Sequence, residues 1–177
     1  MLVVSKNLSG LVKSFDVCRP ELVEEFSIKI ELSGTVRRMR DTPTNDDPIR
    51  YESNYDPDKY FEEEHKLTGD LLLRPGQNVL ACSRDKYRMP PGYFGLVQTK
   101  GSLARLFVTA TSNDGQVEPG YDGAITLELS NQATFSVAIS PGHNIAQLFV
   151  FRCTSDAAHP YNGRYQGASA PTLALFK

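Results

Sequence analysis

The side chains that commonly bind metals or form disulfides are few and widely spaced in this chain. Three cysteines and three histidines occur, at Cys18, Cys82, Cys153, His65, His143 and His159. None of the cysteines has the C-x-x-C spacing of structural zinc sites, and an odd number of separated cysteines argues against a disulfide framework. The sequence therefore predicts no structural zinc site and a reducing, cytoplasmic location.

Carboxylates also occur within the alternating, strand-like segments. Glu128 lies in the segment Ala124–Leu129, where apolar and polar residues alternate. In a strand, this alternation puts Glu128 on the face opposite Leu127 and Leu129. The pattern alone fits a solvent-facing glutamate on a half-exposed strand.

The length and charge of the chain limit its partners. The 177 residues carry a formal net charge of -2, with 40% hydrophobic and 23% charged residues. This ordinary globular mixture suits one domain, and it provides no broad basic surface for a nucleic-acid polymer or an anionic membrane. The apolar run at the start is too short to span a membrane and lacks the cleavage pattern of a signal peptide.

Alternating residues and Pro-Gly pairs predict a mainly β fold. Strands are expected at Phe26–Leu32, Ala124–Leu129, Phe135–Ile139 and Ala146–Phe151. Pro-Gly pairs at 75–76, 91–92, 119–120 and 141–142 predict tight turns between strands. A helix is expected over Cys18–Phe26, with its proline in the first turn. The predicted fold is all-β, a sandwich or distorted jelly roll with one or two short helices.

Two segments lie outside this β pattern. Residues 40–66 are polar and rich in Asp, Glu, Pro and Tyr, which predicts a surface insertion. Its aromatic residues belong either to a solvated loop or to a contact with a neighbouring subunit or protein partner; they are Tyr51, Tyr55, Tyr60 and Phe61. Residues 154–177 form a C-terminal arm that is expected either to pack in an ordered way or to stay loose until a ligand binds.

Three segments, taken in order, resemble motifs of the dCTP deaminase family, within the dCTP deaminase and dUTPase superfamily. They are Lys100-Gly-Ser-Leu-Ala-Arg-Leu106, Val117-Glu-Pro-Gly-Tyr-Asp-Gly123 with the strand that ends at Asn131, and Tyr161-Asn-Gly-Arg-Tyr-Gln-Gly167 with Pro171-Thr172. The resemblance covers most of Leu67 to Thr172. It implies a single dUTPase-like β-sandwich barrel over residues 1–177, and a homotrimer whose sites lie between subunits.

The resemblance implies hydrolytic deamination of a deoxycytidine nucleotide to the deoxyuridine nucleotide and ammonia. The H-x-E and P-C-x-x-C zinc motifs of other base deaminases are missing from the sequence, so a carboxylate would move the protons without zinc. Glu128 matches the catalytic glutamate of the family, and Arg105 matches an arginine that orients water and stabilises charge. The pyrimidine triphosphate would bring Mg²⁺, held mainly by its own phosphate oxygens.

The implied nucleotide contacts come from three places in the chain. The first motif would bind the phosphates, the second would contact the sugar, and the arm would close over the phosphates and base. The matching residues are Lys100, Gly101, Ser102, Glu118, Tyr121, Arg164, Tyr165 and Gln166. Without the resemblance, Tyr121 equally fits a residue that packs over its own turn, and Arg105 fits a surface arginine.

Several positions depart from the family pattern. Gly101 stands where the family has a serine that helps to position the water and the base, and Ala168 and Ala170 replace a glutamine and a glycine. An extra stretch around Ser112–Asp114 lengthens the loop before Glu118. Three functions therefore fit the sequence: a deaminase with altered contacts, a dUTPase-like diphosphatase in which Glu118 activates the water, and a nucleotide-binding regulator without catalysis.

Overall fold

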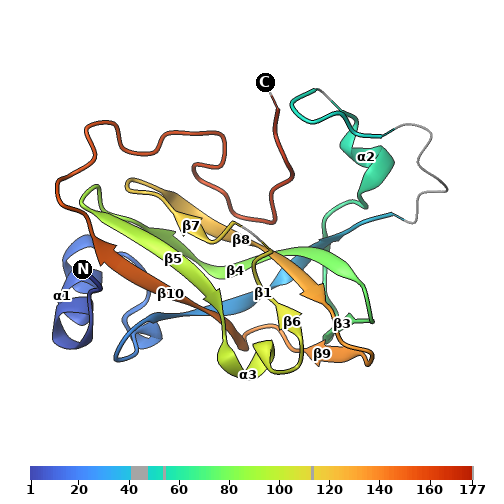
Figure 1. The fold of residues 1–177 in the computed structure, drawn as a ribbon, viewed down its shortest axis with the longest axis horizontal. Helices are drawn as coiled ribbons and strands as arrows, with labels where there is room; N and C mark the ends of the chain where they lie inside the picture. The colour runs from blue at the N-terminus through green and yellow to red at the C-terminus, as the bar shows by residue number, and fades with distance from the viewer. Residues whose placement is uncertain (41–47, 54, 113, 177) are drawn as a thin grey trace.

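The structure is a computed structural model that describes residues 1–40, 48–53, 55–112 and 114–176 (Figure 1). Its helical segments are α1 (Ser5–Phe15), the 3-10 turn η1 (Pro20–Leu22), α2 (Pro57–Tyr60) and α3 (Gly101–Ala104). The strands are β1 (Ile28–Arg38), β2 (His65–Lys66), β3 (Leu71–Leu73), β4 (Asn78–Arg88), β5 (Tyr93–Thr99), β6 (Val108–Thr109), β7 (Gln116–Val117), β8 (Asp122–Asn131), β9 (Val137–Ile139) and β10 (Asn144–Arg152).

The strands form one large curled antiparallel sheet and one small one. The order in the large sheet is β6-β8-β4-β1-β10-β5-β7, and β2 pairs separately with β1. Strands β3 and β9 pair with each other. The prediction of a mainly β fold with a few short helices is confirmed, and the expected strands at 124–129 and 146–151 lie within β8 and β10.

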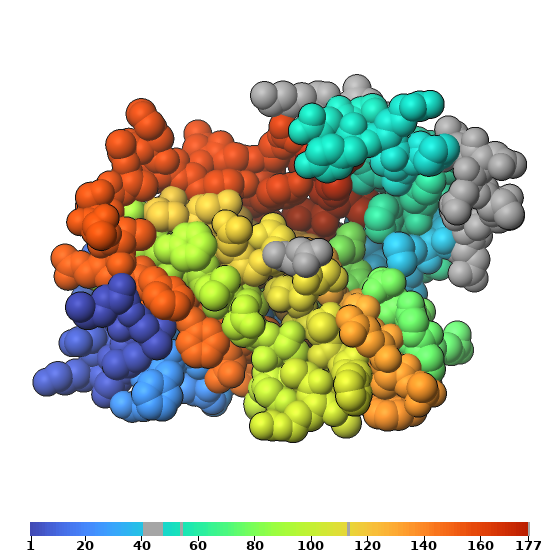
Figure 2. Space-filling view, viewed as in Figure 1, coloured from blue at the N-terminus to red at the C-terminus, as the bar shows by residue number. Residues whose placement is uncertain are grey.

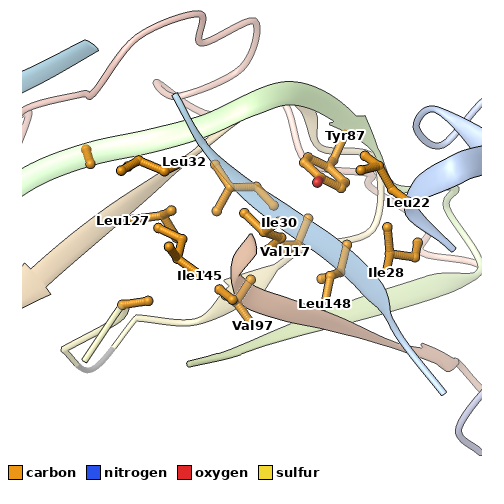
Figure 3. Close-up of a cluster of buried hydrophobic side chains, with 14 of the residues drawn as sticks. Leu22, Ile28, Ile30, Leu32, Tyr87, Val97, Val117, Leu127, Ile145 and Leu148 are labelled. Atoms are coloured by element: carbon orange, nitrogen blue, oxygen red, sulfur yellow. The ribbon is translucent and has the colours of Figure 1, made fainter. Parts of the chain in front are cut away.

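Strand β1 joins the two halves of the large sheet. Its residues 28–31 pair with β10, whereas residues 32–38 pair with β4, and the register shifts within both pairings. Such irregularities bend a strand, so the two halves of the sheet face one another across the core. Figure 3 shows apolar side chains from both halves filling this space, among them Ile30, Leu32, Val97, Leu127 and Leu148, all fully buried.

The expected helix over Cys18–Phe26 is wrong. Only the single turn of η1 forms there, because Val23 already pairs with Ile28 and the chain reverses into β1. The strand expected over Phe26–Leu32 begins at Ile28 in β1, and Phe26 lies before it with its side chain 60% exposed. The longest helix is instead α1, whose inward residues recur at helical spacing and are buried: Leu8, Leu11 and Val12.

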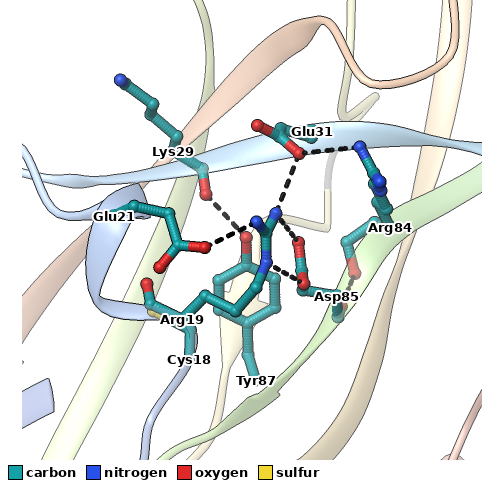
Figure 4. A network of polar contacts seen from close by, with 9 residues as sticks. Cys18, Arg19, Glu21, Lys29, Glu31, Arg84, Asp85 and Tyr87 are labelled. Atoms are coloured by element: carbon teal, nitrogen blue, oxygen red, sulfur yellow. Dashed lines mark hydrogen bonds and ion pairs between the residues drawn. The ribbon is translucent and has the colours of Figure 1, made fainter. Parts of the chain in front are cut away.

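An ion-pair network fastens the segment after α1 to the sheet (Figure 4). Arg19 donates two hydrogen bonds to the carboxylate of Asp85 on β4, at 2.6 and 2.9 Å, and a third to Glu31 on β1 at 3.0 Å. Arg84 lies 3.6 Å from the same Glu31 carboxylate. The guanidinium fork matches a carboxylate geometrically, so this network fixes the orientation of the segment against β1 and β4.

Residues 48–53 and 55–64 form an excursion, which leaves the sheet after β1 and returns to it at β2. Helix α2 lies within it beside the end of β1, where the amide of Arg40 donates to the carbonyl of Tyr60, and β2 pairs with β1 through Thr35 and Lys66 (Figure 1). In the described chain, no helix is long and apolar enough to cross a membrane. All three cysteines are free thiols.

The C-terminal arm, described from Thr154 to Phe176, has neither helix nor strand and runs across the face of β8 (Figure 1). Main-chain hydrogen bonds join Gly167 to Asp122 at 2.7 Å and Ala124 to Ala168 at 2.8 Å. The arm therefore covers the strand face that carries the polar side chains. The division into one domain with an insertion over 40–66 and an arm over 154–177 stays a prediction.

Candidate active site

Strand β8 presents Glu128 on the face that the arm covers. The side chains of Leu127 and Leu129 are fully buried on the core side, and Glu128 points to the other side. Glu128 pairs in register with Leu80 on β4, and both line a cavity of about 600 Å³. The position predicted from the alternating pattern is thus a cavity wall rather than an open surface.

The cavity is built from five separate parts of the chain. Strands β4 and β8 form its floor, the loop before β8 and the arm form two walls, and the root of the excursion forms another. Residues that line the cavity include Met39, Phe61, Leu80, Ser112, Asp114, Glu118, Tyr121, Thr126, Glu128, Tyr161, Tyr165, Thr172 and Ala174. The lining combines apolar and polar side chains, as is common in small-molecule sites, and the root of the excursion contributes the apolar Met39 and Phe61.

Burial raises the pKa of the Glu128 carboxyl, since a charged form loses hydration in the cavity. The nearby carboxylate of Asp114 raises it further, while backbone hydrogen bonds at Ser112 and at Glu128 itself oppose the rise. Oxygen Oε2 of Glu128 is buried and has no hydrogen-bond partner among the described residues. A partly desolvated carboxyl of this kind is a better proton acceptor, once ionised, than an exposed one.

Tyr121 lines the cavity with its hydroxyl already engaged. It donates a 2.6 Å hydrogen bond to the main-chain carbonyl of Ala124, and its ring meets that of Tyr161 edge-on at 5.7 Å. Burial raises the pKa of Tyr121, so the group remains a protonated donor. The side chain is 8% exposed. It therefore presents a fixed ring to the cavity, and this packing is the alternative that the sequence had left open.

The arm residues expected to contact nucleotide occupy three different positions. Tyr165 lines the cavity, and its hydroxyl accepts a 3.4 Å hydrogen bond from the amide of Leu175. Gln166 uses both ends of its amide on the turn before β8, accepting from Asp122 and donating to Gly120, each at 3.1 Å. Arg164 is exposed and donates to the carbonyl of Leu175. Gln166 and Arg164 do not line the cavity of their own chain.

The residues of the first motif lie away from the cavity. Gly101 and Ser102 begin the exposed turn α3, and Arg105 ends it, also exposed. None of these residues, nor Lys100, lines the cavity that contains Glu128. A Cβ added at Gly101 would lie 3.4 Å from Nη1 of Arg105, so a serine would fit there with little adjustment. One chain alone does not bring Arg105 and Glu128 together.

The charges around the cavity are all of one sign. Its described lining includes the carboxylates of Asp114, Glu118 and Glu128 but no lysine, arginine or histidine. A triphosphate placed there would meet three like charges without a counter-charge. Cations from outside this chain's own cavity are needed before a nucleotide triphosphate can bind.

Residues 8–153 match the dCTP deaminase-like family. The chain belongs to this family. A dUMP-forming dCTP deaminase of Mycobacterium bovis is 32% identical over 186 residues, which cover 97% of this chain and 94% of the relative. A dUMP-forming dCTP deaminase of Mycolicibacterium vanbaalenii is 34% identical over 157 residues, which cover 85% of this chain and 80% of the relative.

The fold is also similar to that of a solved dCTP deaminase. The crystal structure of 2'-deoxycytidine 5'-triphosphate deaminase from Agrobacterium tumefaciens superposes with a TM-score of 0.62 at 19% sequence identity. The match covers 84% of this chain and 47% of that chain, so this chain spans about half its length. At this identity the similarity concerns the fold, and it agrees with the curled antiparallel sheet described above.

Some cavity residues of this dCTP deaminase family member were not singled out from its sequence. Thr126 lies two residues before Glu128, so the same alternation places it on the cavity face. Asp114 belongs to the extra stretch already noticed in the loop. Met39 and Phe61 carried no such signal, because they reach the cavity through the path of the excursion.

Proposed function

We propose that the protein deaminates dCTP, with Glu128 as the residue that moves protons. The observation that carries this proposal is the partly buried Glu128 carboxyl, with an unpaired oxygen, in a cavity large enough for a nucleoside. Membership of the dCTP deaminase-like family, and relatives named dCTP deaminases over most of the chain, support the choice of substrate.

The chemistry requires one base that later acts as an acid. Glu128 would take a proton from water as the oxygen attacks C4 of the cytosine ring and would pass it to ring nitrogen N3, which gives a tetrahedral carbon with a hydroxyl and an amino group. The carboxylate would then take the hydroxyl proton and deliver it to the amino group, so that ammonia departs as the C4 carbonyl forms. One water is consumed and one ammonia is released for each nucleotide. A raised pKa serves both halves of this cycle, since the group must accept a proton and return it.

We infer that a second copy of the chain completes each site. The like-charged cavity lacks a cation among its described lining residues, while Lys100, Ser102 and Arg105 stand at the exposed α3. Leu106 and Phe107, next to these residues, are 42% and 65% exposed, as expected of a surface that another protein covers. A homotrimer would place α3 of one copy at the Glu128 cavity of the next, where Arg105 would orient the water.

The phosphates would be neutralised by these cations together with Mg²⁺ brought by the nucleotide. No group of three metal-binding side chains occurs among the residues that the structure describes. Mg²⁺ is commonly bound through substrate phosphates and waters, so a dedicated protein cage is not required for this role. Zinc independence, which the sequence predicts, is a separate proposal that metal removal can test.

The names of the relatives favour a second reaction at the same site. Both relatives described above are named as dUMP-forming. We therefore infer that this protein also hydrolyses the bond between the α- and β-phosphates, releasing pyrophosphate. Glu118, which lines the cavity near the sugar end of the implied nucleotide, is the candidate to activate that second water.

Product analysis tests the proposal directly. The protein is incubated with dCTP and Mg²⁺, and the ammonia released is measured enzymatically. The nucleotides are then separated and identified by mass spectrometry. We expect one ammonia for each dCTP consumed, with dUMP as the nucleotide product. Accumulation of dUTP would confine the activity to deamination. Binding of dCTP without ammonia release would instead favour a regulatory protein and overturn the enzymatic proposal.

A further inference from the structure

An aromatic contact joins the excursion to the end of the arm. The ring of Phe176 meets Tyr51 and Tyr55 edge-on, each at a centroid distance of 5.7 Å. The hydroxyl of Tyr55 also donates a 3.1 Å hydrogen bond to the carbonyl of Ala174. We call Tyr51, Tyr55 and Phe176 the aromatic clasp. Figure 2 shows the excursion, in cyan, lying directly against the dark red end of the arm.

The excursion is itself held firmly at its root. Arg40 donates from Nε to the carbonyls of Asp58 and Phe61, at 2.8 and 3.0 Å, and its amide donates to Tyr60 at 2.8 Å. The amide of Glu62 donates to the carbonyl of Arg38 at 2.9 Å. These bonds tie the short helix α2 to the end of β1, so the clasp has a fixed support on the sheet.

The clasp and the cavity share the same stretch of the arm. Ala174, which accepts the hydrogen bond of Tyr55, lines the cavity together with Thr172. On the other side, Phe61 lines the same cavity from the root of the excursion. The contact that holds Ala174 against the excursion therefore also keeps one wall of the cavity in place.

We propose that Tyr55 is a positioning residue that keeps the end of the C-terminal arm closed over the cavity. The effect of Tyr55 on nucleotide binding rests on the proposed function, whereas its hold on the arm is a property of the protein without nucleotide. Beyond Thr172 the arm has neither helix nor strand, and in the described structure its hydrogen bonds go to Tyr55 and, within the arm, to Arg164 and Tyr165, so the contact with Tyr55 has a large effect on this end. Burial raises the pKa of Tyr55, which keeps its hydroxyl available as a donor.

Three variants separate the ring from the hydroxyl. Tyr55→Phe removes only the hydrogen bond, and we expect the arm to open about fivefold more often, the effect of one ordinary hydrogen bond. Tyr55→Ala and Phe176→Ala also remove the ring contact, and we expect an increase of about tenfold or more. Phe15→Ala is the matched control, because Phe15 is an exposed aromatic residue on α1, which lies at the opposite side of the molecule from α2 (Figure 1).

Arm opening is measured without nucleotide in two ways. Hydrogen exchange followed by mass spectrometry reports on the arm peptide that contains Thr172 and Leu175, whose amides are hydrogen-bonded in the closed arm. Limited trypsin digestion reports on cleavage after Arg164. We expect both rates to rise in the three clasp variants and to stay unchanged in Phe15→Ala. Unchanged exchange and cleavage in Tyr55→Ala and Phe176→Ala would overturn the proposal.

The effect of the aromatic clasp on nucleotide binding is measured by steady-state kinetics with dCTP and Mg²⁺. We expect KM to rise in Tyr55→Phe by no more than the fivefold change in arm opening while kcat changes less, because the apparent affinity falls in proportion to the fraction of protein whose arm is closed. An arm that opens in the exchange experiment without any change in KM would overturn the positioning role. If the wild-type protein released no ammonia, the proposed reaction would fail, but the exchange experiment would still decide whether the clasp holds the arm.

Discussion

The side-chain oxygens of Thr126 and Thr172 lie 2.8 Å apart, and the amide of Thr172 donates to the same Thr126 oxygen at 3.1 Å. This pair fixes the arm to β8 two residues before Glu128, on the same face of the strand. The arm therefore meets the sheet directly beside the carboxyl that we propose as catalytic.

Thr126→Val keeps the shape of the side chain and removes both of these hydrogen bonds. We expect KM for dCTP to rise about 5- to 30-fold, the effect of roughly 1–2 kcal/mol of lost hydrogen bonding. Steady-state kinetics measures this change. Thr109→Val is the matched control, because the Thr109 hydroxyl is buried without a partner in the described structure. Equal KM values for the two variants would contradict the anchoring role of Thr126.

Glu128→Gln removes proton transfer and keeps the size of the side chain. We expect the deamination rate to fall about 10²- to 10⁴-fold while dCTP still binds, since general acid–base catalysis is worth about that much. Ammonia release and calorimetric binding measure the two effects. Normal turnover would show that another group moves the protons.

Folding stability provides a check on the same variant. Burial disfavours ionised Glu128 in the folded state, so its folded pKa lies above the unfolded value and ionisation at neutral pH favours unfolding. Glu128→Gln is therefore expected to unfold at a higher temperature than the wild type at pH 7. The difference should shrink at about pH 3.5, where the carboxyl is protonated in both states. A less stable variant at pH 7 would indicate that the carboxylate is favourably paired.

Asp114→Asn tests the electrostatic link between the two carboxyl groups. Glu128 acts as a base when ionised, so activity is expected to fall as the pH drops through its raised pKa. Removing the negative charge of Asp114 lowers that pKa, and the acidic limb of the kcat/KM profile should move to lower pH. Asp70→Asn, an exposed carboxylate outside the cavity lining, serves as the control. An acidic limb that keeps its position in Asp114→Asn, or moves to higher pH, would show that Asp114 does not raise the pKa of Glu128.

Mixing inactive variants tests whether two copies share a site. Glu128→Gln and Arg105→Ala should each be inactive alone, and unfolding and refolding them together would mix the two variants within the proposed trimers. A site is intact when its Glu128 and its Arg105 both come from copies that retain them, so about a quarter of wild-type activity is expected from an equal mixture. A mixture as inactive as its components would place both residues in the site of one chain, and an Arg105→Ala variant that is active alone would remove Arg105 from the chemistry.

Metal removal tests the zinc-free mechanism. A zinc-selective chelator such as phenanthroline should leave ammonia release unchanged, whereas excess EDTA should abolish it by removing Mg²⁺ from the triphosphate. Added Mg²⁺ should restore the activity because the like-charged cavity requires the nucleotide's charge to be neutralised. Loss of activity with phenanthroline, and recovery with zinc, would overturn the zinc-free proposal.

Local patterns predicted the parts of the site that lie on one strand. The alternation around Glu128 gave its face correctly, because neighbouring residues of β8 decide which side is buried. The walls from Phe61 and Ala174 were missed, since they meet only through contacts between distant parts of the chain. Helix α1 was missed because Ser5, Asn7 and Gly10 weaken its local signal, and packing of its apolar face stabilises it instead.

Strand β8 lies inside the sheet and pairs with β4 along most of its length and with β6 at its end, while the rest of the cavity wall is largely loop, arm and excursion. The reacting group and the groups that select a ligand therefore belong to parts of the chain with very different tolerance of mutation. Over evolutionary time, insertions or replacements in the peripheral segments can retune which base is accepted without disturbing the strand that performs the reaction. Divergence within such a lineage should accumulate around the opening of the cavity before it reaches the floor.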